Sequence, residues 1–169
     1  MKLNEIKDEN QQPEIIVLIG LPGSGKSTWK EKMLSKAGSD YTVISSDDII
    51  EDFAEKEGKS YTKVFDKYIG RASKMAKQKF NEAIKNHENV IWDQTNLSEK
   101  KRRGILSQVP DGYKKIAVAF EVNDEELKRR LDKRASETGK EIPDHVLKNM
   151  AQSYQPPSES EGFDEVFIM

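Results

Sequence analysis

The sequence predicts an α/β fold, in which a central parallel β-sheet of about five strands carries helices on both faces. Apolar, β-branched runs typical of buried strands alternate along the chain with longer stretches of helical periodicity. A glycine-rich loop separates the first such run from the first helical stretch. Strands that are separated by helices pair in parallel through right-handed crossovers, so the helices cover both faces of one sheet.

The chain has 169 residues, which is enough for one domain with a hydrophobic core. We expect a single domain over 14–169 after a flexible, polar leader at 1–13. The net charge is −2, so any contact with nucleic acid would have to rest on local basic clusters. The absence of cysteine excludes disulfides and thiolate metal sites. Because no apolar run approaches the ~20 residues of a membrane span, and the N-terminus does not resemble a signal peptide, we expect a cytoplasmic protein without a membrane partner.

The first strand, expected over 14–19, leads directly into a candidate phosphate-binding loop. Residues 20–28 fit the Walker A pattern G-x-x-x-x-G-K-[ST]. Helical composition over 27–36 places this loop at a helix N-terminus, where free N–H groups and the helix dipole attract anions. Within the loop, Lys26 can reach the β- and γ-phosphates, and the Ser27 hydroxyl can ligate Mg²⁺. The residues expected to bind the nucleotide are Gly23, Ser24, Gly25, Lys26, Ser27 and Thr28. The flanking strand and helix favour this interpretation over an ordinary glycine-rich turn.

A second strand is expected over 41–46, and it ends at Asp47 and Asp48. After a helical segment with a break near 58–60, a long helix is expected over 60–86. Its apolar residues recur at spacings of three and four and form one continuous stripe. We expect the whole stripe to lie in the core: Val64, Phe65, Tyr68, Ile69, Ala72, Met75, Ala76, Phe80, Ala83 and Ile84.

The rest of the chain continues the alternation of strands and helices. A strand over 90–93 ends in Asp93, a helix follows from about residue 98, and a further strand covers 115–122. Asn123 or Asp124 caps the next helix, and a polar segment at 135–141 follows it. The last expected elements are a short helix over 143–152, a loop at 155–162 and an edge strand over 163–169.

Polar residues follow three of the expected strands and should meet at one site. In parallel α/β sheets, ligands bind at the carboxyl ends of the strands. An aspartate at 47 or 48 could accept a proton from an attacking hydroxyl group, and either could instead cap the following helix. Asp93 could hold Mg²⁺, or it could bond the backbone of a turn. Thr95 and Asn96 are expected to brace the loop rather than to react.

Two basic clusters have both a functional and an ordinary interpretation. The cluster at 129–134 would usually be the solvated face of a helix. A polar segment with a glycine and a helix opened by proline follow it, which is the arrangement of a lid over a phosphate. Arg130 and Arg134 are four residues apart and share a helix face, and arginine is suited to bidentate phosphate contacts. In the run 100–103 we expect solvated side chains, with Arg102 as a further candidate for holding a phosphate.

The motifs at these spacings resemble the kinase domain of the 5′-hydroxyl polynucleotide kinases, the phage and bacterial end-healing enzymes. The matching stretches are 20–29, Ser-Ser-Asp-Asp at 45–48, Trp-Asp-Gln-Thr-Asn-Leu at 92–97, and the lid arginines. The resemblance covers about 14–169 and implies a P-loop kinase fold with an arginine-bearing lid. It also implies that Asp47 is the general base, which leaves Asp48 as the helix cap. Arg134 and Arg130 would stabilise the phosphates, and Asp93 would bind the metal together with Ser27.

The resemblance further implies that the γ-phosphate of ATP, or of another nucleoside triphosphate, moves to the 5′-OH end of DNA or RNA with Mg²⁺. Two features depart from the family pattern. Some members carry an arginine three residues after the base, where this chain has Ile50. Some also carry a phosphatase motif, D-x-D-G-T, which does not occur in this sequence. We therefore expect a separate ligase or 3′-phosphatase as a protein partner.

Two other function classes fit the same motifs. The acidic balance and Ile50 favour a P-loop kinase that acts on a nucleoside, sugar or other metabolite. A non-catalytic ATP-binding module associated with nucleic acid would keep the loop but would need no base at Asp47. Because Asp47 and the lid arginines are all present, the sequence favours an enzyme.

Overall fold

The computed structural model describes residues 12–36 and 40–169, so most of the expected leader lies outside the described residues. Five parallel strands form one sheet in the order β2-β3-β1-β4-β5, which confirms the predicted fold class. The strands are β1 (Glu14–Ile19), β2 (Tyr41–Ile44), β3 (Asn89–Asp93), β4 (Lys114–Ala119) and β5 (Glu165–Ile168). The helices are α1 (Lys26–Ser35), α2 (Ser46–Glu57), α3 (Tyr61–Lys85), α4 (Glu99–Leu106), α5 (Asp124–Thr138) and α6 (Asp144–Ser153), with a 3₁₀ turn, η1 (Glu159–Glu161).

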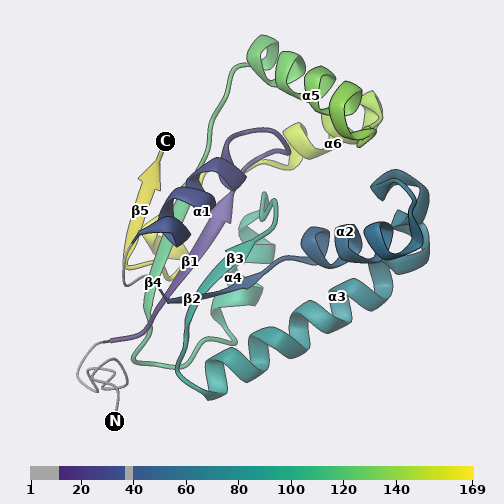
Figure 1. The fold of residues 1–169 in the computed structure, drawn as a ribbon. Helices are drawn as coiled ribbons and strands as arrows, with labels where there is room; N and C mark the ends of the chain where they lie inside the picture. The colour runs from purple at the N-terminus through teal and green to yellow at the C-terminus, as the bar shows by residue number, and fades with distance from the viewer. Residues whose placement is uncertain (1–11, 37–39) are drawn as a thin grey trace.

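The central strand β1 supplies side chains to both layers of the core. Successive residues of a strand point to opposite faces of the sheet. Ile15, Val17 and Ile19 therefore lie in the cluster formed with α3 and α4, whereas Ile16 and Leu18 lie in the cluster that packs against α1. Figure 1 shows α1 in front of the sheet, α4 behind it and α3 along its lower right side. The two-sided core explains why β1 is apolar at every position after Glu14.

The second strand is shorter than predicted, and this changes the place of the two aspartates. Strand β2 ends at Ile44 because Ser45 caps α2, its Oγ accepting the backbone N–H of Asp48 at 3.2 Å. Asp47 and Asp48 consequently lie in the first turn of α2. The prediction that Asp48 is the cap is wrong, since Ser45 already satisfies that end of the helix.

The long helix α3 agrees with its predicted bounds to within one residue at each end. Ser60 caps its start, with Oγ accepting the backbone N–H of Lys63. Nine of the ten stripe residues are buried or half-buried, but Met75 is 39% exposed. Met75 lies at the margin of the stripe. The neighbouring residues that pack into the core are the small Ala72 and Ala76. The expectation for Met75 was therefore wrong.

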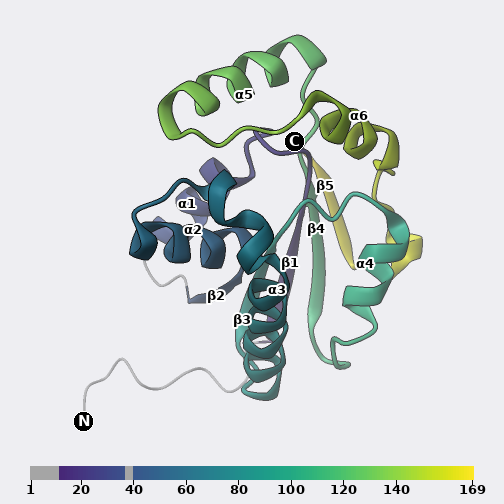
Figure 2. The same cartoon turned by 90° about the vertical axis from the view of Figure 1, so that its right-hand side faces the viewer.

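Helices α5 and α6 lie across the carboxyl ends of the strands (Figures 1 and 2). Helix α5 begins at the cap Asn123 and continues to Thr138, so residues 135–138 of the predicted polar segment are helical. The helix ends at Gly139, whose φ of 71° is left-handed and favours glycine. None of the helices in the described part of the chain is long and apolar enough to cross a membrane.

Candidate active site

A cavity of about 630 Å³ opens at the carboxyl ends of the central strands, beneath α5. It brings together the phosphate loop, the start of α2, the end of β3 and the inner side of α5. The candidate residues that line it are Gly23, Ser24, Gly25, Lys26, Ser27, Thr28, Asp47, Asp48, Asp93, Arg130 and Arg134. These residues, assigned to the site from the sequence, therefore face one space, whereas Arg102 does not.

The phosphate loop is shaped by glycine and fixed to the strand β3 loop. Gly23 has a φ of 80° and Gly25, which caps α1, has a φ of 110°, conformations that L-residues rarely adopt. The backbone N–H of Gly20 donates to the carbonyl of Thr95 at 3.0 Å, and Asn96 Nδ2 donates to the carbonyl of Leu18 at 2.7 Å. Thr95 and Asn96 thus brace the loop, as the sequence predicts.

Two local features of the phosphate loop suit it to binding an anionic ligand. The first-turn N–H groups of α1 point out of the helix N-terminus at Gly25, where an anion is favoured. The hydroxyl Oγ of Ser24 is buried, and it has no hydrogen-bond partner within 12–36 and 40–169. A buried polar atom of this kind is normally satisfied by a partner, and a phosphate oxygen in the loop would supply one.

Lys26 is a half-buried cation of the site. Its Nζ donates to the carbonyls of Gly20 at 2.6 Å and Leu21 at 3.0 Å. Burial lowers the pKa of Lys26 to about 8, although the nearby charges of Asp93 and Asp47 act in the opposite direction. Desolvation is the dominant cause because it penalises the ammonium form more than the two carboxylates stabilise it. An additional anion in the loop would restore the charged form.

Asp47 is held in place by a tyrosine from the next helix. Tyr61 Oη donates to Asp47 Oδ1 at 2.6 Å, and burial together with this bond raises the pKa of the Tyr61 phenol. Nothing in the described residues bonds to the other carboxylate oxygen of Asp47. That oxygen is therefore the one available to accept a proton from a bound hydroxyl group.

Lys140 connects the lid to the same corner of the site. Its Nζ lies 2.9 Å from Glu51 Oε1 and 4.0 Å from the centre of the Tyr61 ring. Both Lys140 and Glu51 line the cavity. The carbonyl of Gly139 also accepts a hydrogen bond from Thr62 Oγ1 at 3.2 Å. The end of α5 is thus docked on the start of α3, next to Asp47.

Asp93 is paired with a lysine of α1. Lys30 Nζ donates to Asp93 Oδ2 at 2.7 Å and to Asp48 Oδ2 at 3.4 Å. Burial lowers the pKa of Lys30, but its bond with Asp93 and the charge of Asp93 outweigh this and raise the pKa. Burial raises the pKa of Asp48, and Lys30 opposes that shift. Lys30 therefore bridges the two carboxylates, and its single charge balances only one of them.

A dedicated metal cage is absent from the described ranges, where no three His, Cys, Asp or Glu side chains gather to hold a metal ion. Mg²⁺ does not require one, because it is commonly bound by one or two protein oxygens together with substrate phosphates and waters. The Ser27 hydroxyl and Asp93 both line the cavity and are oxygen donors of the suitable kind. Their assignment as metal ligands stays a prediction.

The lid presents two arginines to the cavity. Arg130 donates from Nε to Glu126 Oε1 at 2.8 Å and from Nη1 to the carbonyl of Gly23 at 3.3 Å. Its side chain thereby reaches the phosphate loop itself. Arg134 lies one turn further along α5, lines the cavity and is close enough to Lys26 to lower the pKa of that lysine. The geometry suits both guanidinium groups to contacts with phosphate oxygens.

Sequence reasoning missed four residues of this site. Lys30 follows Lys26 by one turn, and Glu51 follows Asp47 by one turn, so helical spacing alone could have indicated both. Tyr61 and Lys140 carry no comparable signal, because Tyr61 depends on the packing of α3 against α2 and Lys140 on the docking of the end of α5. Ile50 is fully buried among Ala54 and Val64, so position 50 faces the core of the α2–α3 pair rather than the cavity.

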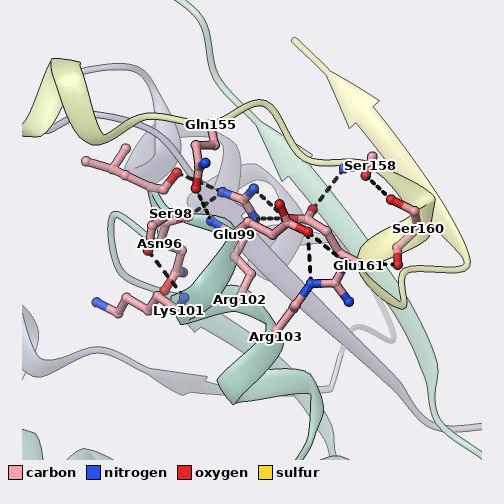
Figure 3. Close-up of polar contacts among 11 residues, drawn as sticks. Asn96, Ser98, Glu99, Lys101, Arg102, Arg103, Gln155, Ser158, Ser160 and Glu161 are labelled. Atoms are coloured by element: carbon pink, nitrogen blue, oxygen red, sulfur yellow. Dashed lines mark hydrogen bonds and ion pairs between the residues drawn. The ribbon is translucent and has the colours of Figure 1, made fainter.

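Arg102 does not belong to the site, which corrects the expectation that it could hold a phosphate. Its side chain is 0% exposed. Figure 3 shows its guanidinium enclosed by Glu161 of η1 and by the loop after β3. Nη2 lies 2.5 Å from Glu161 Oε1, and Nη1 donates to the carbonyls of Asn96 and Leu97 at 3.0 and 2.8 Å. These partners leave the group unavailable to a ligand.

Comparison with known proteins identifies the family. Residues 15–157 match the family AAA_33, described as an AAA domain. The mouse heterogeneous nuclear ribonucleoprotein U-like protein 2 is 27% identical over 160 residues, which are 92% of this chain and 21% of that protein. The L-seryl-tRNA(Sec) kinase of Methanococcus maripaludis is 28% identical over 156 residues, 89% of this chain and 56% of that enzyme. The chain thus spans only part of the curated relatives it matches.

Solved structures show the same architecture. The Pnkp1/Rnl/Hen1 RNA repair complex contains a chain that is 27% identical, with a TM-score of 0.67 over 94% of this chain and 48% of that one. A gluconokinase from Sinorhizobium meliloti 1021 is 19% identical, with a TM-score of 0.56 over 94% of this chain and 82% of that one, and this likeness concerns the fold alone. Since the family match covers most of its length, the chain belongs to the AAA domain family AAA_33 and has the fold of the P-loop kinases.

Proposed function

We propose that this P-loop kinase is a 5′-hydroxyl polynucleotide kinase, which transfers the γ-phosphate of ATP or another nucleoside triphosphate to the 5′-OH end of DNA or RNA. The observation that carries the proposal is the presence of Lys26, Asp47 and Arg134 around one cavity. A likeness of 27% to a chain of an RNA repair complex supports a polynucleotide acceptor.

In this proposal each residue acts on one part of an in-line displacement. The 5′ oxygen attacks the γ-phosphorus as the bond to the β-phosphate oxygen breaks, and the nucleoside diphosphate leaves. The proton of the hydroxyl group passes to the free carboxylate oxygen of Asp47, which Tyr61 holds in position. Lys26, Arg130 and Arg134 stabilise the negative charge on the transferring group. Mg²⁺, when bound with the nucleotide near Ser27, would neutralise further phosphate charge.

The test is transfer of labelled γ-phosphate from ATP to 5′-OH oligonucleotides of DNA and RNA. We expect Asp47→Ala to lower the rate by roughly a hundredfold to ten-thousandfold, the usual contribution of a general base. Asp52→Asn is the matched control, because Asp52 is an exposed carboxylate of the same helix that does not line the cavity. The proposal fails if the wild-type protein labels no polynucleotide end of any length.

A kinase of small hydroxyl compounds is the second candidate, and the charge of the acceptor side favours it. Asp47, Asp48 and Glu51 all line the cavity, and Lys140, the lysine nearest them on the lid side, is paired with Glu51. Carboxylates at this position suit a neutral or cationic acceptor better than a phosphate-bearing one. A panel of nucleosides, sugars and amino alcohols in an ATP-consumption assay separates the candidates, since only the second predicts faster turnover with one of these compounds than with oligonucleotides.

A further inference from the structure

Helix α3 has a charge that differs sharply from that of the whole chain. The full sequence has 28 lysines and arginines and 30 carboxylates. Helix α3 alone carries seven lysine and arginine side chains against two carboxylates, Asp66 and Glu82. The excess of positive charge is therefore local, as a contact with nucleic acid would require in a protein of slightly negative net charge.

Six of these seven cations share one face of the helix. With 3.6 residues per turn, positions three, four, seven or eight apart fall on the same side. The face, called the basic stripe below, consists of Lys63, Lys67, Arg71, Lys74, Lys77 and Lys85, all of which are exposed. The residues between them on that side are Gly70, Gln78 and Asn81, so no carboxylate interrupts the stripe. The buried residues of α3, such as Ala72 and Phe80, lie on the opposite side.

The basic stripe is not explained by pairing within the protein. Lys67 lies 2.5 Å from Glu57, and Arg71 lies 5.0 Å from the centre of the Phe53 ring. Across 12–36 and 40–169, the other four lysines form no ion pair. Like charges spaced three and four apart destabilise a helix, whereas alternating charges would stabilise it. An uninterrupted stripe therefore costs stability that an ordinary solvated face would not.

The basic stripe begins in the first turn of α3, next to the acceptor corner of the active site. Tyr61, the first residue of α3, bonds Asp47, and Lys63 lies in the same turn on the opposite, solvent-exposed side of the helix. From there α3 runs along the outside of the sheet, away from the carboxyl ends of the strands (Figures 1 and 2). Lys63 and Lys85 are separated by roughly 33 Å at 1.5 Å per residue. That length matches about ten phosphates along one strand of a B-form duplex.

We infer that the basic stripe of α3 binds the sugar–phosphate backbone of the acceptor strand, whose 5′ end lies in the cavity. The inference rests on the proposed function. It supplies a contact with the acceptor backbone that neither Ile50 nor the acidic acceptor side provides. A membrane surface fits less well, because Met75 is the one large apolar side chain of α3 that is substantially exposed among the described residues. Regularly spaced cations with few exposed apolar neighbours match a linear polyanion.

The test measures binding of a fluorescent 5′-OH oligonucleotide of about 20 nucleotides over a series of salt concentrations. The stripe variant is Lys74→Gln/Lys77→Gln/Lys85→Gln, and glutamine keeps the helix propensity. The control variant, Lys36→Gln/Lys100→Gln/Lys148→Gln, removes the same charge from exposed positions outside α3. We expect the stripe variant to bind about tenfold more weakly and to lower the slope of log K against log salt by about 2, with little change in the control.

A second measurement separates this inference from the proposed function. If the acceptor runs along α3, the stripe variant raises the KM for the long oligonucleotide more than the KM for a dinucleotide. Equal effects of the stripe and control variants on binding would overturn the inference while leaving kinase activity intact. Stripe-dependent binding without phosphate transfer would keep the inference and reject the kinase. Binding of anionic vesicles or of an acidic protein, with no binding of oligonucleotides, would also overturn it.

Discussion

Arg102 of α4 and the two arginines of α5 carry the same guanidinium group in opposite settings. Arg102 is 0% exposed and bonds one carboxylate and two backbone carbonyls. Arg130 is 40% exposed in its side chain, and Arg134 lines the active-site cavity. The comparison teaches that saturation by protein partners separates a structural cation from one that can bind a phosphate. Residue type and local sequence do not distinguish them.

The largest expected effect comes from breaking the buried pair. Arg102→Met leaves Glu161 charged and buried, and it also removes the donor to the carbonyls of Asn96 and Leu97. Removing one partner of a buried pair typically costs about 3–5 kcal/mol. We expect urea unfolding to show a loss of that size in the free energy of unfolding.

The neighbouring residue supplies the control for this prediction. Arg103 forms an exposed pair with Glu99, at 2.7 Å, with its side chain 51% exposed. Exposed pairs contribute about 0–1 kcal/mol, so Arg103→Met should leave stability nearly unchanged. Similar losses in the two variants would mean that burial does not distinguish the two arginines.

The next effect should appear in the rate of phosphate transfer and not in stability. Arg134→Gln removes a cavity-lining guanidinium, and loss of one donor to developing negative charge typically lowers the rate roughly a hundredfold to a thousandfold. Its free energy of unfolding should stay within about 0.5 kcal/mol of the wild type. The rate is measured with labelled ATP and whichever acceptor the protein uses.

Arg129→Gln is the matched control on the same helix. Arg129 is bound to Glu126 at 2.7 Å and does not line the cavity. Its replacement should leave the transfer rate within about twofold, as expected of a surface residue away from the chemistry. Equal losses of activity in Arg129→Gln and Arg134→Gln would argue against the interpretation that only the cavity-facing side of α5 contacts the phosphates.

The local part of this structure was predictable from the sequence. The continuous apolar run of β1 indicates burial on both faces, and the periodicity of α3 indicates which side is buried, so that information lies within each element itself. The phosphate loop is likewise a continuous motif. The sequence therefore predicted the five-stranded sheet, the bounds of α3 to within one residue at each end and a common place for the candidate residues.

Contacts between distant segments were not predictable. The run at 100–103 appeared solvated because Glu161, the partner of Arg102, lies 59 residues away. Ser45 and Asp48 are both good caps, and only the path of β2 decides between them. Tyr61 reaches Asp47 because α3 packs on α2, and Lys140 reaches Glu51 because the end of α5 docks on the start of α3. Arg102 and Lys140 show this most clearly, since their partners lie 59 and 89 residues away along the chain.

Lys26 combines features of both settings, because it is half-buried and lies in the site with Arg134. Burial lowers its pKa to about 8, with Asp93 and Asp47 opposing this shift and Arg134 and Lys140 adding to it. The unfolded chain holds this proton up to its ordinary pKa of 10.5. The folded protein therefore binds fewer protons between about pH 8 and 10.5, and the contribution of Lys26 to stability rises with pH across that window.

Binding of a nucleoside triphosphate should reverse the sign of this pH dependence. Phosphate anions favour the ammonium form of Lys26, so binding takes up a proton above about pH 8. We expect the affinity for ATP to stay nearly constant between about pH 7 and 7.5, where Lys26 keeps its proton. Above about pH 8 the affinity should weaken by at most tenfold per pH unit. Calorimetry in two buffers of different ionisation enthalpy measures the proton uptake directly. In Lys26→Arg, whose side chain stays charged throughout, that uptake should disappear. A wild-type affinity that is flat to about pH 9.5 would mean that Lys26 keeps its proton without the ligand, and that its burial, like that of Arg102, is already compensated by the protein.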